Sequence, residues 1–327
     1  MKKVLVDSDT GLDDAMGIVH GLLSDDIEII AITSVFGNAE MVDCAYHAIE
    51  IVDLMSKSVP VIKGASAPLI AGCGPAPQVH GRYARGPLGK LDLDARVTPG
   101  YAAVCILEQI RRYGSDLVIV AMGRLTNLAL AMRLDPDLMR RVGHIYWMGG
   151  AIAVSGNTSS VAEANADGDP EAAKIVCTSN LPLTILPLDV TMTALILEAD
   201  IERLKAVRHP GVQHLVRIVP YYIDFYESIL GTRACAAHCG LLLALAMDPS
   251  LITRSHRLPV DVEVGGSLTR SQLVVDRRKL RRLDEPDTSM QDGARVVFEA
   301  DVGRYRTMFM DALLGADRQL ATAGLES

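Results

Sequence analysis

Aromatic residues, long apolar runs and excess positive charge are scarce in this 327-residue sequence. Aromatic residues make up 4 % of the chain and hydrophobic residues 49 % in all, so the core must be largely aliphatic. The net charge of −8 argues against a nucleic-acid-binding surface. Apolar stretches such as residues 241–247 are too short to span a bilayer. A small neutral or cationic ligand fits this composition better than a polyanion or a membrane.

The sequence also has little that indicates export or zinc binding. Only three apolar residues separate Lys3 from Asp7, too few for the apolar region of a signal peptide, so we expect a cytoplasmic protein. Its six cysteines are expected to be reduced thiols, most of them buried. Cys235, His238 and Cys239 superficially offer zinc ligands. No CxxC or HxxxH elsewhere supplies a partner pair, which argues against zinc at that motif.

Residues 4–15 are the stretch around which the rest of the chain is organised. Residues 4–6 are apolar, as in a central strand of a buried parallel sheet, and helical spacing of apolar residues begins at residue 13. Gly11 supplies the turn between strand and helix. This corner lies at the carboxyl end of a strand, where open α/β sheets bind their ligands.

Four acids, Asp7, Asp9, Asp13 and Asp14, meet at this corner. Their mutual repulsion and desolvation are costly unless a cation or hydrogen-bond donors compensate. Oxygen donors suit Ca²⁺ or Mg²⁺, with Ca²⁺ favoured by an irregular site of many ligands. The alternative is that Asp9 caps the helix and that Asp13 and Asp14 only complement its dipole.

Strands and helices alternate along most of the sequence. We therefore expect an α/β fold in a single domain over residues 1–327, with a mainly parallel, doubly wound (Rossmann-like) sheet flanked by helices and a more helical C-terminal part. After the first strand, predicted strands cover residues 27–35, 59–62, 116–122, 144–147 and 183–188, the last of the parallel set, followed by late strands at 260–264, 272–275 and 296–299. Predicted helices cover residues 13–23, 41–55, 101–113, a segment ending near 133, a segment beginning near 170, and 201–207, 212–230, 236–247 and 304–314.

Polar residues follow several of these strands. Asn38 lies at the same edge as the acids, and a turn after residue 122 offers Thr126 and Asn127, either as carbonyl ligands or as a helix cap. The next loop carries amides and acids that suit a polyhydroxylated ligand, although an ordinary solvated loop has the same composition. The residues in question are Asn157, Glu163, Asn165, Asp167 and Asp169.

Two further features, a long loop and a pair of tyrosines, are open to either a structural or a functional interpretation. Residues 63–100 have no periodicity and are rich in Gly and Pro, as in a functional loop or lid. His80 lies in this loop, and a lone loop histidine is more often structural or incidental. Tyr222 and Tyr226 share a helix face and form either part of the core or a lid over a ligand.

Taken together, several motifs resemble the inosine-uridine-preferring nucleoside hydrolase family, over nearly the whole chain. Each motif is weak, but their ordered combination is specific. The motifs are Asp7-Ser8-Asp9-Thr10-Gly11-Leu12-Asp13-Asp14-Ala15, Phe36-Gly37-Asn38, Leu125-Thr126-Asn127, Met148-Gly149-Gly150, residues 156–173, Pro187-Leu188-Asp189-Val190-Thr191 and Leu268-Thr269-Arg270.

The resemblance implies Ca²⁺-dependent hydrolysis of the N-glycosidic bond of ribonucleosides through an oxocarbenium-like state. It implies that Asp9 binds Ca²⁺ and acts as general base, that Asp14 is a bidentate ligand, and that Thr126 gives its carbonyl. Ribose hydroxyls would contact Asp13, Glu163 and Asn165, with Asn38 and Asn157 nearby. Tyr222, Tyr226 and His238 would cover and protonate the nucleobase. The resemblance also implies a homodimer or homotetramer.

The chain departs from the family's pattern at two positions. Cys239 stands where the family has a metal-ligand Asp, and a thiolate suits Ca²⁺ poorly. We expect weakened metal binding unless another acid, such as Asp224, replaces the lost ligand. Arg124 stands where the family usually has Pro.

Two other functions compete with this interpretation. In a haloacid-dehalogenase-like Mg²⁺ phosphatase, Asp7 of the stretch Asp7-Ser8-Asp9-Thr10 would attack phosphorus. The second acid pair and the order of the later motifs argue against it. The other alternative is a ribonucleoside- or ribose-binding protein whose catalysis is impaired by Cys239.

Overall fold

The computed structural model describes residues 1–276 and 293–319, which are built around an eight-stranded sheet of order β3-β2-β1-β4-β5-β6-β12-β9. Neighbouring strands are parallel from β3 to β12, and β9 runs antiparallel to β12 at the edge. The predicted α/β fold with a mainly parallel sheet is confirmed. The strands are β1 (Lys2–Ser8), β2 (Ile27–Ser34), β3 (Val61–Ile62), β4 (Leu117–Ala121), β5 (His144–Met148), β6 (Leu183–Leu186), β9 (Ile252–Leu258) and β12 (Ala294–Ala300).

The strand order reverses at β1. The chain proceeds outward through β2 and β3, then returns to place β4 on the other side of β1. Along β1, Val4 and Val6 pack into the core on one face of the sheet, and Leu5 packs into the core on the other. This alternation buries β1 on both faces. The carboxyl ends of β1 and β4 therefore border the switch point, where doubly wound sheets bind ligands.

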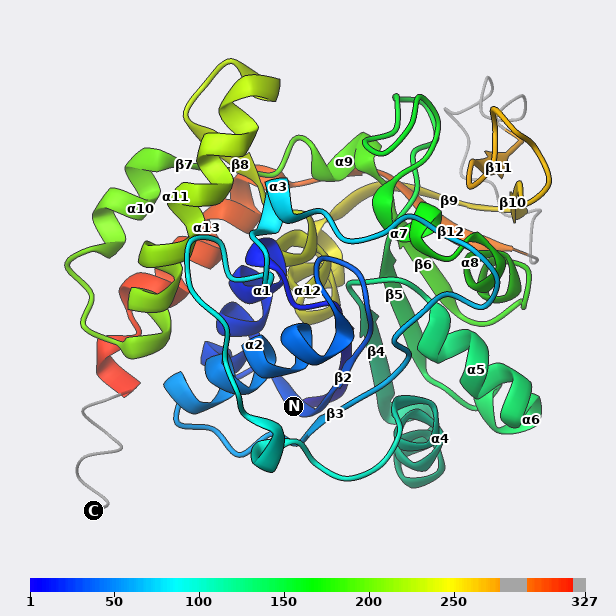
Figure 1. Cartoon of the computed structure of the whole chain (residues 1–327), viewed down its shortest axis with the longest axis horizontal. Coiled ribbons are helices and arrows are strands. Elements are labelled where there is room, and N and C mark those ends of the chain that lie inside the picture. Colours follow the sequence, from blue (N-terminus) through cyan, green and yellow to red (C-terminus); the bar gives the residue numbers. More distant parts are fainter. Residues whose placement is uncertain (277–292, 320–327) are drawn as a thin grey trace.

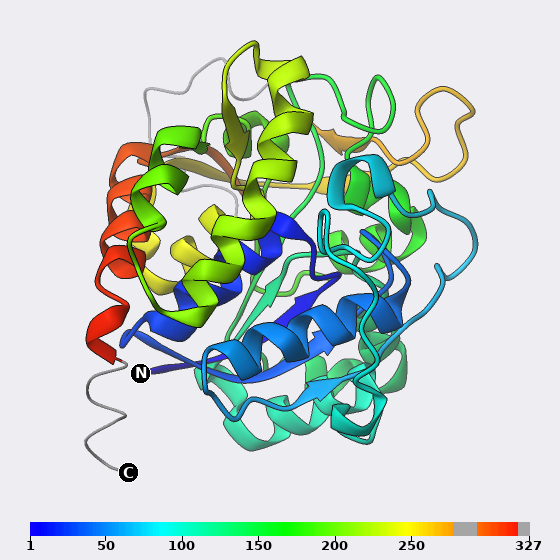
Figure 2. The same ribbon diagram turned by 60° about the vertical axis from the view of Figure 1, so that its left-hand side comes forward.

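Helices cover both faces of the sheet, as Figure 1 shows. On one face lie α1 (Leu12–Leu23), α2 (Met41–Leu54) and α12 (His238–Met247), joined by α10 (Glu198–Leu204), α11 (Pro210–Leu230) and α13 (Val302–Leu314). On the other lie α4 (Ala102–Tyr113), α5 (Thr126–Leu134), α6 (Pro136–Met139) and α8 (Pro170–Cys177). The helix α12 is buried along its whole length, because it packs between α1 and the sheet. Figure 2 shows the red α13 beside the green α10 on the outer side.

The structure corrects the predicted topology in its C-terminal part. We predicted residues 183–188 as the last parallel strand, but β12 pairs in parallel with β6. The sequence did not indicate β9, nor the antiparallel pair β7 (Leu195–Leu197) and β8 (Ala234–Ala236). Strands of three residues are too short to show alternation, and a strand's direction depends on a partner remote in sequence. Because β8 takes residues up to 236, α12 begins at residue 238 and not at 236.

The long segment 63–100 is largely irregular, with a short helix α3 (Pro77–His80) and a 3₁₀ turn η1 (Asp94–Arg96). The helix α3 packs against α11, which brings the segment over the amino end of α1. The late strands at residues 260–264 and 272–275 are present as β10 (Val260–Val262) and β11 (Leu273–Val275), which pair with each other. In residues 1–276 and 293–319, no helix has the length and apolarity needed to cross a membrane.

Candidate active site

Asp9, Asp13 and Asp14 lie together at the carboxyl end of β1, each less than 5 % exposed. Asp9 Oδ2 accepts the Asn38 backbone N–H at 2.9 Å. A Cβ atom on Gly37 would lie 1.8 Å from the same oxygen, so only glycine permits this approach. The turn after β2 therefore fixes the orientation of the Asp9 carboxylate.

Asp14 is held from three directions. Its Oδ1 accepts Ser8 Oγ–H at 2.9 Å, and its Oδ2 accepts the Gly11 N–H at 3.0 Å and the Asn38 amide at 3.2 Å. The alternative interpretation placed the cap of α1 at Asp9, but in the structure Asp14 caps this helix through the Gly11 N–H. Asp13 instead accepts the backbone N–H of Cys239 at 3.1 Å, which ties α1 to the start of α12.

Burial and mutual repulsion dominate the electrostatics of these acids. Burial raises the pKa of Asp9 to about 7, with a further upward contribution from Asp13 and an opposing one from Arg124. Burial and the charges of Asp13 and Asp9 raise the pKa of Asp14 well above its usual range. A divalent cation would remove this repulsion, and carboxylate oxygens are suitable ligands for it. The donor set therefore fits a divalent cation.

Asp7 belongs to a separate network. Its Oδ1 accepts Thr33 Oγ1–H at 2.6 Å and Asn127 Nδ2–H at 2.7 Å, which joins β1 to β2 and to α5. Burial raises the pKa of Asp7 to about 7. Asn127 also donates to the Ser34 carbonyl at 3.1 Å and accepts the Ala65 N–H at 2.8 Å. Both Asp7 and Asn127 thus hold the backbone around the acids.

The carbonyl that faces the acid cluster belongs to Met122, not to Thr126. Met122 directly follows β4, and its carbonyl oxygen lies 2.8 Å from Asn165 Nδ2 and 3.5 Å from Cys239 Sγ. Thr126 is the first residue of α5, so its carbonyl points along the helix, and its hydroxyl donates to Asp169 Oδ2 at 2.7 Å. The geometry thus does not support Thr126 as a carbonyl ligand.

Aromatic side chains from two segments cover the acids. The ring centroids of Tyr222 and Tyr226 lie 4.8 Å apart on α11, and that of His80 lies 5.3 Å from Tyr222. His80 Nδ1 accepts the Leu12 N–H at 3.2 Å, at the first residue of α1. Burial lowers the pKa of His80 to about 4, so the ring is neutral. The sequence interpretation left His80 aside, because only the packing of α3 on α11 brings it here.

His238 connects this aromatic group to the interior. Its Nε2 lies 2.6 Å from Tyr226 Oη, and its Nδ1 lies 2.7 Å from Thr191 Oγ1, at the end of α9 (Leu188–Thr191). Burial lowers the pKa of His238, while the nearby Asp13 acts in the opposite direction. The pair of Tyr226 and His238 is therefore a hydrogen-bonded proton donor and acceptor beside the acid cluster.

The loop after β5 has less free hydrogen-bonding capacity than its composition suggests. Glu163 caps α7 (Ala164–Gly168): its oxygens accept the backbone N–H groups of Gly150, Asn165 and Ala166 at 2.8, 2.9 and 3.2 Å. Asn165 donates to the carbonyls of Met122 and Met148, which leaves its side-chain oxygen as an acceptor. Asn157 is exposed and accepts the Ala164 N–H at 2.9 Å. Asn165 thus directly adjoins the acid cluster through Met122.

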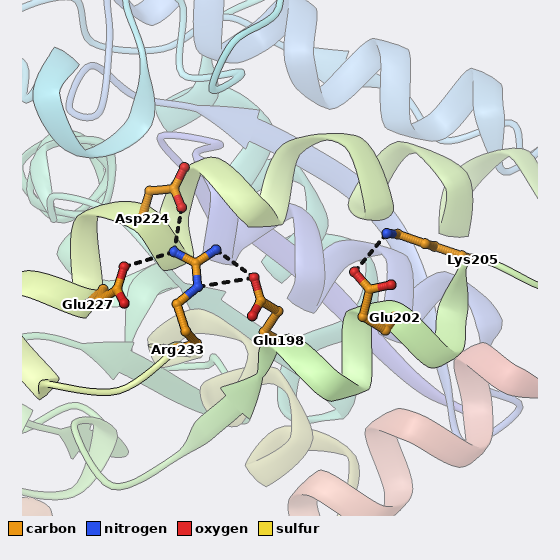
Figure 3. Close-up of polar contacts among 6 residues, drawn as sticks. All are labelled: Glu198, Glu202, Lys205, Asp224, Glu227 and Arg233. Carbon is orange, nitrogen blue, oxygen red and sulfur yellow. Dashed lines mark hydrogen bonds and ion pairs between the residues drawn. The ribbon is translucent and has the colours of Figure 1, made fainter.

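Asp224 does not replace the carboxylate that Cys239 lacks. Its Oδ1 pairs with Arg233 Nη1 at 2.6 Å, on an exposed part of α11. Figure 3 shows Arg233 between Asp224, Glu227 and Glu198, which fastens the end of α11 to α10. This cluster is a surface ion-pair network.

Sequence and structure comparisons agree with this geometry. The sequence profile of the inosine-uridine preferring nucleoside hydrolase family matches residues 4–307. The chain belongs to this family. It is 34 % identical over 319 residues to the inosine-uridine preferring nucleoside hydrolase of Leishmania major, covering 95 % of this chain and 97 % of that protein. It is also 34 % identical over 283 residues to the enzyme of the same name from Crithidia fasciculata, covering 86 % and 89 %.

A solved structure supports the same assignment. The purine-preferring ribonucleoside hydrolase from Gardnerella vaginalis superposes with a TM-score of 0.87 at 31 % identity, covering 96 % of this chain and 99 % of that one. The protein is thus a nucleoside hydrolase, a glycosidase that acts on the N-glycosidic bond of ribonucleosides. Its family is metal-dependent, which agrees with the buried donor groups at the carboxyl end of β1.

Proposed function

We propose that this nucleoside hydrolase cleaves ribonucleosides by attack of a water molecule that Asp9 deprotonates, while Tyr226 and His238 protonate the leaving base. The observation that carries the proposal is the convergence of the Asp9, Asp13 and Asp14 carboxylates beneath the His80, Tyr222 and Tyr226 rings. A ribose fits hydroxyl-binding acids, and a nucleobase fits flat aromatic neighbours.

Asp9 has suitable surroundings for a general base. The Asn38 N–H orients its carboxylate, and its buried position at the carboxyl end of β1 shields it from bulk water. The ion would be held by Asp9, Asp14 and the Met122 carbonyl, which replaces Thr126 in the assignment we made from the sequence. Ca²⁺ is the ion that the family resemblance implies. When bound, such an ion lowers the pKa of water and orients sugar hydroxyls.

The sugar contacts follow from the remaining hydrogen-bonding capacity. Asp13 keeps one oxygen beyond its bond with the Cys239 N–H, and Asn165 keeps its side-chain oxygen. These acceptors suit ribose hydroxyl donors and would position the anomeric carbon near Asp9. Glu163 and Asn38 act mainly by fixing the surrounding backbone, and Asn157 lies furthest out as an exposed loop contact.

Protonation of the leaving base falls to the Tyr226–His238 pair. His238 Nε2 shares a hydrogen bond of 2.6 Å with Tyr226 Oη, and His238 Nδ1 shares one of 2.7 Å with Thr191 Oγ1, which fixes the orientation of the ring. In this relay the Tyr226 hydroxyl gives its proton to the base, and the Nε2–H of a protonated His238 replaces it on Tyr226 Oη, which leaves both side chains neutral; His238 then regains a proton from solvent. Protonation of the departing nitrogen lowers the barrier to cleavage of the glycosidic bond.

A nucleoside panel tests this function. Inosine, guanosine, adenosine, uridine and cytidine are incubated with the protein, with and without divalent cations, and free base and ribose are quantified. We expect equimolar ribose and base from at least one nucleoside, and loss of this activity on chelation. Tight nucleoside binding by calorimetry without product would indicate the binding-protein alternative. Phosphate release from phosphomonoesters without base release would indicate the phosphatase.

A further inference from the structure

Cys239 directs a thiol at the acid cluster. It is the second residue of α12 and 3 % exposed, and its Sγ lies 3.5 Å from the Met122 carbonyl oxygen. Ligand atoms of Cys239, Asp13 and Asp14 all lie within 4.8 Å of one another. The first turn of α12 is fixed by the bond from the Cys239 N–H to Asp13. The thiol is therefore held beside Asp14 and the Met122 carbonyl, two of the groups that would bind the ion.

A thiol in this position changes which ions are favoured. Ca²⁺ and Mg²⁺ take oxygen ligands, and a sulfur ligand contributes little to their binding. Zn²⁺, Co²⁺ and Cd²⁺ bind thiolate strongly and also accept carboxylate or carbonyl oxygen. Two carboxylates, one carbonyl and one thiolate make a complete set of four ligands for such an ion. The same groups leave Ca²⁺ with only part of its usual six to eight oxygens.

Arg124 also disfavours Ca²⁺ at this site. Its side chain is 3 % exposed, with the guanidinium 4.4 Å from the Phe36 ring centroid, and its charge opposes the upward shift of the Asp9 pKa. A buried cation near Asp9 reduces the negative potential on which binding of a hard ion depends. Binding through a metal–sulfur bond depends less on that potential.

We propose that the metal site of this chain selects a thiophilic divalent cation such as Zn²⁺ over Ca²⁺, with Cys239 as a thiolate ligand beside Asp9, Asp14 and the Met122 carbonyl. The inference rests on the proposed function, since it concerns the ion of that same site. On binding, the thiol proton passes to solvent. The motif Cys235-Ala236-Ala237-His238-Cys239 is not the ligand set, because His238 is bonded to Tyr226 and Thr191.

Cobalt substitution tests this inference without measuring activity. Co²⁺ is titrated into the metal-free protein and followed by absorption, because a thiolate ligand produces a ligand-to-metal charge-transfer band in the near ultraviolet. We expect that band at one equivalent of Co²⁺, its loss on addition of Zn²⁺, and its persistence in excess Ca²⁺. By calorimetry, Zn²⁺ should bind at least about a hundredfold more tightly than Ca²⁺.

Three variants separate Cys239 from the other thiols. Cys239→Ser should abolish the charge-transfer band and weaken Zn²⁺ binding at least about tenfold. Cys239→Asp should abolish the band and raise Ca²⁺ affinity at least about tenfold, because it restores a charged oxygen ligand. Cys177→Ala, in the buried face of α8 on the other side of the sheet, should leave the band unchanged.

The outcomes distinguish this inference from the proposed function. Absence of the band in the wild type, or a band retained in Cys239→Ser, would overturn the assignment of Cys239 as a ligand. Equal Ca²⁺ affinities of the wild type and Cys239→Asp would also overturn it. Nucleoside hydrolysis with Ca²⁺ and no cobalt band would refute the ion selectivity alone. A cobalt band with no hydrolysis in any metal would support the selectivity and refute the proposed function.

Discussion

The Nε2 atoms of His47 and His214 lie 2.9 Å apart in the interior between α2 and α11. His47 Nδ1 lies 3.0 Å from the Thr10 carbonyl, which can only accept, so this nitrogen carries the proton. In the neutral pair, His47 Nε2 therefore accepts from His214 Nε2–H. This chain of bonds connects the residue after Asp9 to the helix that carries Tyr222 and Tyr226.

This histidine pair should make the fold sensitive to acid. Burial, as the largest cause, lowers the pKa of His214 from 6.5 to about 4. The folded state therefore binds fewer protons than the unfolded state between these values. The stabilisation is fully present above pH 6.5 and is lost as the pH falls toward 4. We expect His214→Gln, which keeps an N–H donor but cannot titrate, to flatten this dependence.

The measurement is the free energy of unfolding in urea at several pH values between 7.5 and 4, a range chosen as roughly spanning the two pKa values. In this range the wild type should lose up to about 1.4 kcal/mol per pH unit more than His214→Gln. Acids such as Asp7 contribute with opposite sign but equally in both proteins, so they cancel in the difference. Parallel pH profiles of the wild type and His214→Gln would contradict the prediction.

Replacing Asp9 should abolish hydrolysis without unfolding the protein. Asp9→Asn keeps the volume and can still accept the Asn38 N–H, but it removes the base and one negative charge from the metal site. General-base catalysis contributes about 10²–10⁴-fold, so the rate of nucleoside hydrolysis should fall by at least that factor. Circular dichroism and thermal unfolding verify the fold. Asp137→Asn, at an exposed position in α6, is the control. More than about a tenth of the wild-type rate in Asp9→Asn would exclude Asp9 as the base.

The sequence predicted the central sheet well because its strands are apolar runs between turns. Residues 4–6 and 116–122 had this signal, and they form the two strands that border the site. The convergence of Asp9, Asp13 and Asp14 at one sheet edge was also predicted, because they follow a buried strand directly, whereas Asn165 was named from the family resemblance. Met122 was missed because a backbone carbonyl carries no signal in its side chain. His80 was missed because its position depends on packing between segments more than a hundred residues apart.

His80 should affect substrate binding more than the chemical step. Its ring lies against Tyr222, and its Nδ1 accepts the Leu12 N–H at 3.2 Å. His80→Gln retains an acceptor for that N–H but removes a flat ring from the nucleobase side of the site. Loss of one aromatic contact is worth about 0.5–1.5 kcal/mol, so KM should rise several-fold with kcat within a factor of about two. Steady-state kinetics with the preferred nucleoside measures both constants. A fall in kcat with KM unchanged would instead assign His80 to the chemical step.

Tyr226 should matter only when the leaving group needs a proton. Its Oη lies 2.6 Å from His238 Nε2, so the hydroxyl connects His238 to the part of the site that the aromatic rings cover. Tyr226→Phe removes this hydroxyl and keeps the ring contact with Tyr222, so substrate binding should change little. For nucleosides, kcat should fall by about 10²-fold, the lower range for loss of a general acid. A nitrophenyl riboside releases a stabilised phenolate that requires no proton, so its kcat should fall less than about threefold. Tyr101→Phe, at a residue 75 % exposed, is the control and should leave both rates unchanged. Equal losses with the two substrates would show that Tyr226 supports the site by packing and that the base leaves by another proton route.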